Sequence, residues 1–423
     1  MTFATDCRRA SASSLRMGRR DFIAGSAALS VVATTPLAGR AQSLRLRGLE
    51  EFIRDKAQRD HIPGVAACLI EGDEIAWSHA YGFADLEQRV AMSLDSLQNI
   101  ASISKTFAAT AIMQLREAGL IDLDADVNEY LAFTVRNPYY LGVPISARQL
   151  LTHTSSLRDG PAYPQHYACG DPKMSLGTWV REYLTVGGRF YDEANNFLGR
   201  SPGMQWSYCN IAYGLLGHLV EAVSGIAYPE YCRRNIFAHL EMNDTSWLLA
   251  DIDRRRHAVP YTWASGGQAR GRSWDDGPMG AVQMDGRTRD RPLEDGFHPN
   301  CLYNHPNYPD GFLRTSVNDL SRYLRAYLGG GAFAGQRILQ PETVQDMLDV
   351  KLEAPTRRQG LTWNVNYSVD GEPAWGHSGQ DPGVNTDMRI LPARNLGAIA
   401  FANTNNIAPF EFTRRILETA LLL

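Results

Sequence analysis

Lysine is scarce in this sequence. Only four of the 42 basic residues are lysines, at positions Lys56, Lys105, Lys173 and Lys351, so arginine is the usual cation of the chain. Arginine keeps its proton in proteins and cannot act as a general base, whereas a lysine can. A lysine that stands close to a candidate nucleophile is therefore informative here.

The sequence also lacks the common signatures of metal, redox and nucleic-acid binding. Its cysteines form no CxxC pair, and its ten histidines form no HExxH pair, so we expect neither a zinc centre nor a redox pair. The net charge is −4 and the body of the chain holds no basic block, which argues against a nucleic-acid partner. An exported protein can hold a disulfide, but the sequence assigns no pair among Cys7, Cys68, Cys169, Cys209, Cys232 and Cys301.

Long hydrophobic runs are absent beyond the N-terminal region. Arg19-Arg20 precedes an apolar stretch over residues 24–37 that is too short for a stable membrane span. Gly39-Arg40-Ala41 then offers small residues where a signal peptidase cleaves. We interpret residues 1–41 as an export signal of the twin-arginine type, which predicts a periplasmic or secreted protein. We expect no membrane span in the mature chain, residues 42–423.

Hydrophobic periodicity predicts strands at both ends of the mature chain and helices between them. A helix over 47–59 precedes two strands, 65–70 and 74–81, which a short turn joins. Helices are expected at 102–118, 147–152, 211–223, 228–240, 317–328 and 341–349. Strands are expected at 361–369, 374–379, 387–391 and 397–403, followed by a helix at 409–422.

This order of elements predicts a sheet closed by both ends of the chain, with a helical lobe inserted into it. The sheet lobe covers about 47–100 and 355–423, and the helical lobe covers about 102–350. Residues 266–299 are rich in glycine, arginine and aspartate, which is typical of an exposed insertion. We expect the functional site where the two lobes meet.

The tetrapeptide Ser102-Ile103-Ser104-Lys105 is the main candidate for catalysis. At the start of a helix, residues i and i+3 share a face, so the Lys105 amine is predicted to reach the Ser102 hydroxyl. A serine is a poor nucleophile until a base takes its proton, and a lysine whose pKa is lowered by burial can be that base. No other lysine has a serine three residues before it. On its own, however, the tetrapeptide fits a surface lysine on a helix equally well.

Two further motifs occur once each. Tyr208-Cys209-Asn210 precedes the helix predicted at 211–223. The Tyr208 hydroxyl can carry protons, and the side-chain amide of Asn210 can hydrogen-bond a substrate amide. His377-Ser378-Gly379 lies on a predicted strand, where Gly379 allows a substrate to approach the backbone. The N–H of Gln380 can then pair with that of Ser102 as an oxyanion hole. Taken singly, the tyrosine and the histidine are also compatible with purely structural roles.

In this order and spacing, the three motifs resemble the serine β-lactamase and penicillin-binding-protein superfamily. The likeness is greatest to the branch of class C β-lactamases, D-alanyl carboxypeptidases, D-aminopeptidases and esterases. Family signatures are similar at Leu150-Leu151-Thr152-His153-Thr154-Ser155, Pro202-Gly203, Asp310-Gly311-Phe312 and Gly376-His377-Ser378-Gly379. The resemblance implies an α+β fold: an antiparallel sheet flanked by the N- and C-terminal helices, with an inserted, mostly helical lobe.

The resemblance also implies roles for the motif residues. Ser102 would form the acyl-enzyme, and Lys105 and Tyr208 would share the acid and base steps. Asn210, His377, Gly379 and Gln380 would bind substrate. No metal or organic cofactor is implied, and the partner would be a small molecule or short peptide. The sequence sets no oligomeric state.

The chain departs from the family pattern at two positions. His377 stands where class C β-lactamases have a lysine, and a histidine is only partly charged at neutral pH, so an esterase or peptidase is favoured over an efficient β-lactamase. Ser156 stands where the family usually has glycine, which we expect to change only a loop. Two alternatives stay open: a non-catalytic ligand-binding or sensor protein, and an acyltransferase that uses the same site.

Overall fold

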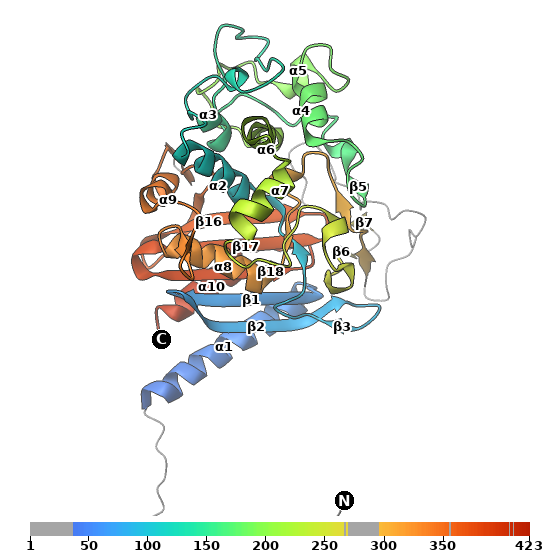
Figure 1. The fold of residues 1–423 in the computed structure, drawn as a ribbon. Helices are drawn as coiled ribbons and strands as arrows, with labels where there is room; N and C mark the ends of the chain where they lie inside the picture. Colours follow the sequence, from blue (N-terminus) through green and yellow to red (C-terminus); the bar gives the residue numbers. More distant parts are fainter. Residues whose placement is uncertain (1–36, 266–267, 270–295, 355–356, 406, 409) are drawn as a thin grey trace, which may run out of the picture.

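The computed structural model (Figure 1) describes residues 37–265, 268–269, 296–354, 357–405, 407–408 and 410–423. The residues of the expected export signal up to 36, and with them Cys7, lie outside this part of the chain, as does most of the insertion expected at 266–299.

A nine-stranded antiparallel sheet forms the base of the fold (Figure 1). Its strands, in spatial order, are β13 (Leu352–Ala354), β14 (Arg357–Gln359), β15 (Asn364–Val369), β16 (Glu372–Asp381), β17 (Val384–Leu391), β18 (Leu396–Ala402), β1 (Gly64–Glu71), β2 (Glu74–Asp85) and β3 (Val90–Ala91). Strands β1 and β18 are neighbours, with Val65 opposite Ala402. The two ends of the chain therefore meet inside the sheet.

Both faces of the sheet are covered. On one face, α1 (Leu37–Arg59) and α10 (Phe410–Ala420) pack against β1, β17 and β18 through a core that includes Leu49, Ile53, Phe412 and Ile416. On the other face, α8 (Val317–Leu328) lies against β1 and β18, and the helical lobe rises beyond it (Figure 1). Every residue of β17 and β18 is buried, as is typical of strands covered by helices on both sides.

The helical lobe surrounds α2 (Ser104–Glu117) and α6 (Ile211–Ser224), which pack against each other. Its other helices are α3 (Ala147–Leu151), α4 (Leu176–Leu184), α5 (Glu193–Asn196), α7 (Tyr228–Cys232) and α9 (Pro341–Leu348). A Cβ added to Gly214 on α6 would lie 1.7 Å from Asn307 Oδ1, and one on Gly217 would lie 2.5 Å from Pro309 Cγ. The two glycines therefore allow the short helix η7 (Tyr308–Asp310) to lie directly against α6.

Short paired strands complete the fold. They are β4 (Gln98–Asn99) with β10 (Arg314–Thr315), β5 (Ala168–Cys169) with β9 (Tyr303–Asn304), β11 (Ala332–Phe333) with β12 (Gln336–Arg337), and β6 (Tyr261–Ser265) with β7 (Gln268–Ala269) and β8 (Phe297–Pro299). Within the described ranges, no single helix is long and apolar enough to cross a membrane; α6 and the helical segment after it pass that test only as a pair, bent by 77°.

The structure confirms the expected α+β class, with a large antiparallel sheet, flanking terminal helices and a helical lobe. Several element boundaries differ from the prediction: for example, β2 extends to Asp85 and β17 begins at Val384. Helix α1 begins at Leu37, ten residues earlier than expected. The helix predicted over 228–240 is divided into α7 and a π-helical turn, Arg233–Phe237. Strand β15 begins at Asn364 and not at 361, since Thr362 has a φ of 74°, which an extended strand does not allow.

Candidate active site

Ser102 lies in a tight turn at the start of α2. The turn is the 3₁₀ helix η1 (Ala101–Ile103), and Ala101 has a φ of 46°, in the left-handed region that residues with a Cβ rarely adopt. Asn99 supports this conformation. Its Oδ1 accepts a hydrogen bond from the Ala101 N–H (2.9 Å), while its Nδ2 donates to Asp381 Oδ2 (3.2 Å). The backbone before the serine is thus tied to the end of β16.

Strand β16 lies directly against the same turn. A Cβ added to Gly379 would come within 2.2 Å of the Ile100 carbonyl oxygen and 2.3 Å of Thr386 Oγ1. We predicted that Gly379 lets a substrate approach the strand backbone. In addition, the absence of a side chain at Gly379 allows the Ile100 carbonyl and the Thr386 hydroxyl to lie against β16.

Lys105 is fully buried and has three close oxygen neighbours. Its Nζ lies 3.0 Å from Ser102 Oγ, 2.7 Å from Asn210 Oδ1 and 2.7 Å from the carbonyl oxygen of Asp310. The amide and carbonyl oxygens can only accept hydrogen bonds. A neutral amine therefore uses its two N–H groups on Asn210 and Asp310, and its lone pair faces the Ser102 hydroxyl.

Tyr208 approaches the serine from the loop before α6. Its hydroxyl donates a hydrogen bond to Ser102 Oγ (2.8 Å), which leaves the serine's own proton free to point at Lys105. The ring of Tyr208 stacks on that of His153, with centroids 4.5 Å apart. The His153 Nδ1 accepts a hydrogen bond from the Cys209 N–H (3.2 Å), so the histidine holds both the ring and the backbone of this loop.

Asp159 orients Asn210 toward the lysine. Both of its carboxylate oxygens accept a hydrogen bond from the Asn210 backbone N–H (2.9 Å each), and Oδ2 also accepts one from Asn210 Nδ2 (2.9 Å). The Ile211 N–H donates to Oδ1 (2.9 Å) as α6 begins. With its Nδ2 held by a carboxylate, the amide must turn its Oδ1 to Lys105.

A second carboxylate, that of Asp310 on η7, lies beside Lys105. Its Oδ2 is 3.7 Å from Nζ and accepts a hydrogen bond from the Tyr163 hydroxyl (2.7 Å). Its Oδ1 accepts one from Asn307 Nδ2 (3.2 Å). Asp159 and Asp310 were not among the predicted site residues. The Asp310-Gly311-Phe312 signature was a usable signal for Asp310, whereas nothing in the sequence pointed to Asp159.

The remaining predicted residues lie on β16. His377 is buried opposite Met388, and its ring centroid is 6.5 Å from that of Tyr208. Ser378 points to the other face of the sheet, where its Oγ donates to Asp387 Oδ1 (2.7 Å). The Gln380 side chain donates to the Asn405 carbonyl (3.5 Å). Direct contacts therefore join Ser102, Lys105, Tyr208 and Asn210. His377 lies near Tyr208 and Gly379 lies against the turn before Ser102, whereas the Gln380 side chain is hydrogen-bonded to Asn405.

Burial dominates the electrostatics of the site. It lowers the pKa of Lys105, against the attraction of nearby carboxylates. Burial also raises the pKa of Asp310 to about 6 and that of Asp381 to about 8, and it raises the pKa of Asp159. Both members of the Lys105–Asp310 pair are thereby shifted toward their neutral forms. Within the described ranges, no three His, Cys, Asp or Glu side chains are placed to hold a metal ion.

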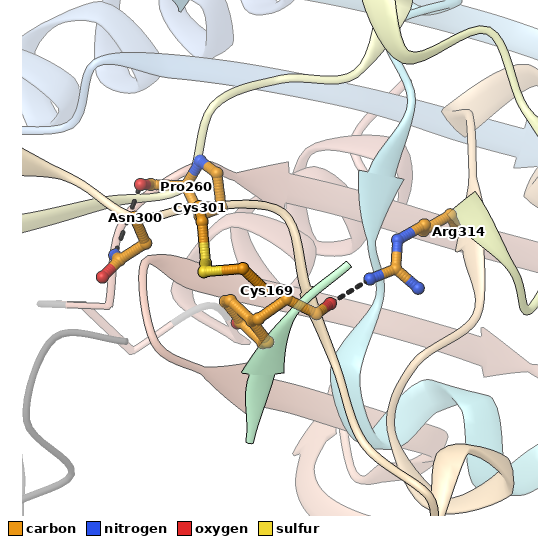
Figure 2. The surroundings of a disulfide bond; sticks show 6 residues. Cys169, Pro260, Asn300, Cys301 and Arg314 are labelled. Atoms are coloured by element: carbon orange, nitrogen blue, oxygen red, sulfur yellow. Dashed lines mark hydrogen bonds between the residues drawn. A yellow bond between two sulfur atoms is a disulfide. The ribbon is translucent and has the colours of Figure 1, made fainter. Parts of the chain in front are cut away.

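A disulfide joins Cys169, at the end of β5, to Cys301 (Figure 2). Two residues before Cys169, the Tyr167 hydroxyl donates to Asp381 Oδ1 (3.1 Å). Two residues after Cys301, the Tyr303 hydroxyl donates to the carbonyl of Pro382 (2.8 Å). The disulfide thus fastens together two segments that both bind the end of β16.

The Beta-lactamase family model matches residues 49–422 of this chain. Protein flp of Staphylococcus aureus (strain N315) is 21% identical over 370 residues, a match that covers 88% of this chain but only 64% of flp. The chain therefore spans less than two thirds of the length of that relative. The D-alanyl-D-alanine-carboxypeptidase/endopeptidase AmpH of Escherichia coli (strain K12) is 24% identical over 381 residues, covering 85% of this chain and 86% of AmpH.

Solved structures share the fold. The D-amino acid amidase from Ochrobactrum anthropi SV3, complexed with D-phenylalanine, superposes with a TM-score of 0.70 at 22% identity and covers 90% of this chain and 99% of its own. The octameric penicillin-binding protein homologue from Pyrococcus abyssi gives a TM-score of 0.68 at 23% identity and covers 89% and 77%. Since the family model extends from α1 to the end of α10, the chain belongs to the Beta-lactamase family.

Proposed function

We propose that this protein is a serine hydrolase that forms an acyl-enzyme at Ser102. One observation carries the proposal: Ser102 Oγ accepts a hydrogen bond from the Tyr208 hydroxyl (2.8 Å) and lies 3.0 Å from Lys105 Nζ. A nucleophile with a buried amine on one side and a phenol on the other has both the base and the acid that acyl transfer requires.

In the acylation step, Ser102 Oγ attacks the substrate carbonyl carbon while its proton passes to Lys105 Nζ. The bond to the leaving alcohol or amine then breaks, and the Tyr208 hydroxyl gives that group a proton. The Lys105 ammonium returns a proton to the tyrosine, which restores both groups. In deacylation, water attacks the ester carbonyl, gives up its proton to the same pair, and Ser102 leaves with a proton.

We further propose that esters and D-amino-acid amides or peptides are better substrates than β-lactams. His377 supports this preference, because it stands on β16 where a class C β-lactamase has a permanently charged lysine. A histidine binds a substrate carboxylate less strongly at neutral pH. Two similar proteins, the carboxypeptidase/endopeptidase AmpH and the D-amino acid amidase, have names that indicate peptide and amide substrates, which also supports this preference.

Labelling with a fluorophosphonate probe tests the acyl-enzyme. The folded wild type should be labelled at Ser102, identified by mass spectrometry of the labelled peptide. Ser102→Ala should not be labelled, and Lys105→Arg should be labelled at least tenfold more slowly, because an arginine in this place cannot take the proton. A folded wild type that is never labelled would favour the alternative of a non-catalytic binding or sensor protein.

A substrate panel tests the preference. Turnover of p-nitrophenyl esters, D-alanyl p-nitroanilide and nitrocefin is compared at equal enzyme concentration, with Ser102→Ala as the background. We expect kcat/KM for an ester or D-alanyl substrate to exceed that for nitrocefin; faster nitrocefin hydrolysis would refute the ranking. Adding an amine acceptor distinguishes acyl transfer, which gives an aminolysis product, from hydrolysis.

We also propose that residues 1–41 direct export through a twin-arginine signal. The Cys169–Cys301 disulfide supports an oxidising location, because structural disulfides persist mainly outside the cytoplasm. Replacing Arg19 and Arg20 by lysine should trap the full-length precursor in the cytoplasm of the host, as measured by fractionation and immunoblotting. Export at the wild-type level by this variant would contradict the proposal.

A further inference from the structure

The contacts of Asp310 with Lys105 separate into two kinds. The backbone carbonyl of Asp310 accepts a hydrogen bond from Nζ at 2.7 Å, so the position of the amine is fixed whatever side chain residue 310 carries. The carboxylate lies farther away, with Oδ2 at 3.7 Å from Nζ. At that distance the side chain makes no hydrogen bond to the amine, and its effect on Lys105 is that of a charge.

The carboxylate is itself held in place. The Tyr163 hydroxyl donates to Oδ2 (2.7 Å) and Asn307 Nδ2 donates to Oδ1 (3.2 Å), so both oxygens have a donor other than Lys105. Asp310 and Lys105 are both buried. In such surroundings two charges at this separation interact strongly, and removal of one changes the proton affinity of the other.

We propose that Asp310 is a positioning residue that supplies the counter-charge of Lys105: its carboxylate stabilises the ammonium that forms when Lys105 takes the proton of Ser102. This inference rests on the proposed function for its catalytic consequence. Its physical content, the dependence of the Lys105 proton affinity on the charge of residue 310, does not require any substrate.

Other groups also face Lys105, and the experiment must separate them from Asp310. The carboxylates of Asp159 and Asp381 act on it through charge, the Cys209 thiol is a further titratable neighbour, and the rings of Tyr208 and Tyr213 lie 4.9 and 5.4 Å from Nζ. Asp159 also orients Asn210, to which it is hydrogen-bonded. Of the charged groups around Lys105, Asp310 raises the pKa of the lysine the most, whereas burial lowers that pKa.

Replacing Asp310 by asparagine should therefore leave Lys105 in place and lower its proton affinity. We expect the Lys105 pKa to fall by about 1–3 units, the range typical of an opposite charge within 4–6 Å. The acid limb of the pH profile of kcat/KM should move to lower pH by the same amount. The plateau rate should fall about tenfold or more, because the ammonium formed during acylation has lost its counter-charge.

The scarcity of lysine makes a direct measurement possible. Full-length protein labelled with [ε-13C]lysine contains only four labelled side chains, and Lys105→Arg identifies the Lys105 signal by its loss. That signal is titrated by NMR in the wild type and in Asp310→Asn. Asp319→Asn is the matched control: Asp319 is another buried carboxylate, on α8, bonded to the Asp244 N–H and Thr245 Oγ1. We expect it to leave the Lys105 titration unchanged.

A second measurement needs no variant. In the wild type, the Lys105 signal should shift as Asp310 titrates, near its raised pKa of about 6. The proposal is overturned if the Lys105 signal titrates at the same pH in wild type and Asp310→Asn, or, where that variant does not fold, if the wild-type signal is insensitive to pH around 6. Failure of the proposed function has a different signature, namely absence of Ser102-dependent labelling and turnover with the Lys105 titration still dependent on Asp310.

Discussion

The contact between Gly379 and the turn before Ser102 yields a quantitative prediction. The methyl group of Gly379→Ala would lie 2.2 Å from the Ile100 carbonyl oxygen, 2.3 Å from Thr386 Oγ1 and 3.1 Å from Ala101 Cβ. The carbonyl has little freedom to move away. It already accepts hydrogen bonds from Thr386 Oγ1 (2.8 Å) and from the Ile103 N–H (3.2 Å). Relief of the clash must therefore displace either β16 or the turn that carries the serine.

Overpacking of this kind costs about 1–3 kcal/mol. For a fold spanning residues 49–422, an unfolding entropy of about 2.1 cal/mol/K per residue converts this loss into a fall in Tm of about 1–4 °C. The effect on chemistry should be larger, since a misplacement of about 1 Å at a reacting group can cost about 100-fold in rate. We expect a small change in Tm and a large fall in the rate of fluorophosphonate labelling of Ser102.

Gly142→Ala provides the control. No heavy atom lies within 4 Å of the Cβ position at Gly142, and its φ is not in the left-handed region, so alanine fits without strain. Tm is measured by differential scanning calorimetry and labelling by mass spectrometry, on both variants and the wild type. If Ser102 is labelled as fast in Gly379→Ala as in Gly142→Ala, Gly379 is not required for β16 to pack against the turn before Ser102.

Three further predictions concern the surroundings of the site. Arg389 and Asp387 form a fully buried ion pair, and Arg389→Met leaves the Asp387 carboxylate without its cation. The free energy of unfolding, measured in urea, should fall by about 3–5 kcal/mol. A loss below about 1 kcal/mol contradicts this prediction. The double variant Cys169→Ser/Cys301→Ser removes a disulfide between residues 132 apart in the sequence. Its free energy of unfolding should be about 2–4 kcal/mol lower than that of the wild type, and an unchanged value contradicts a stabilising role of the disulfide. Burial raises the pKa of Asp381 from 3.8 to about 8, so between these pH values the folded state keeps a proton that the unfolded state has lost. The wild type should lose stability relative to Asp381→Asn as pH rises through that window, and a pH-independent difference in the free energy of unfolding refutes it.

Most of the fold was predictable because its elements are encoded locally. Helix α8 has the range predicted from its apolar periodicity, 317–328, and begins with the Ser316 cap, whose side chain accepts from the Asp319 N–H. Strands β13 and β14 were missed because their sequences, Leu-Glu-Ala and Arg-Arg-Gln, are short and carry no apolar alternation. They form as strands by pairing with their neighbours.

The site was predictable to the extent that short motifs describe it. The spacing of Ser102 and Lys105 fixed their contact, but Asp310 is 205 residues from the lysine that it contacts, so no local pattern connects them. Ser156, in the place of a family glycine, has a φ of 66°, and its Oγ accepts from Asn137 Nδ2 (2.8 Å). The departure thus leaves the left-handed turn intact, a feature that no local sequence pattern indicates.

The geometry of Lys105 depends on the whole fold. Its three oxygen neighbours come from η1, which precedes α2, from the residue before α6, and from η7, which lies against α6 through Gly214 and Gly217. Removal of either acceptor would leave a buried N–H without a partner, which costs about 1–3 kcal/mol. The amine is therefore aimed at Ser102 only when α2, α6 and η7 are packed together. Because β16 holds the serine turn from the other side, the orientation of Ser102 toward Lys105 depends on contacts with both the helical lobe and the sheet.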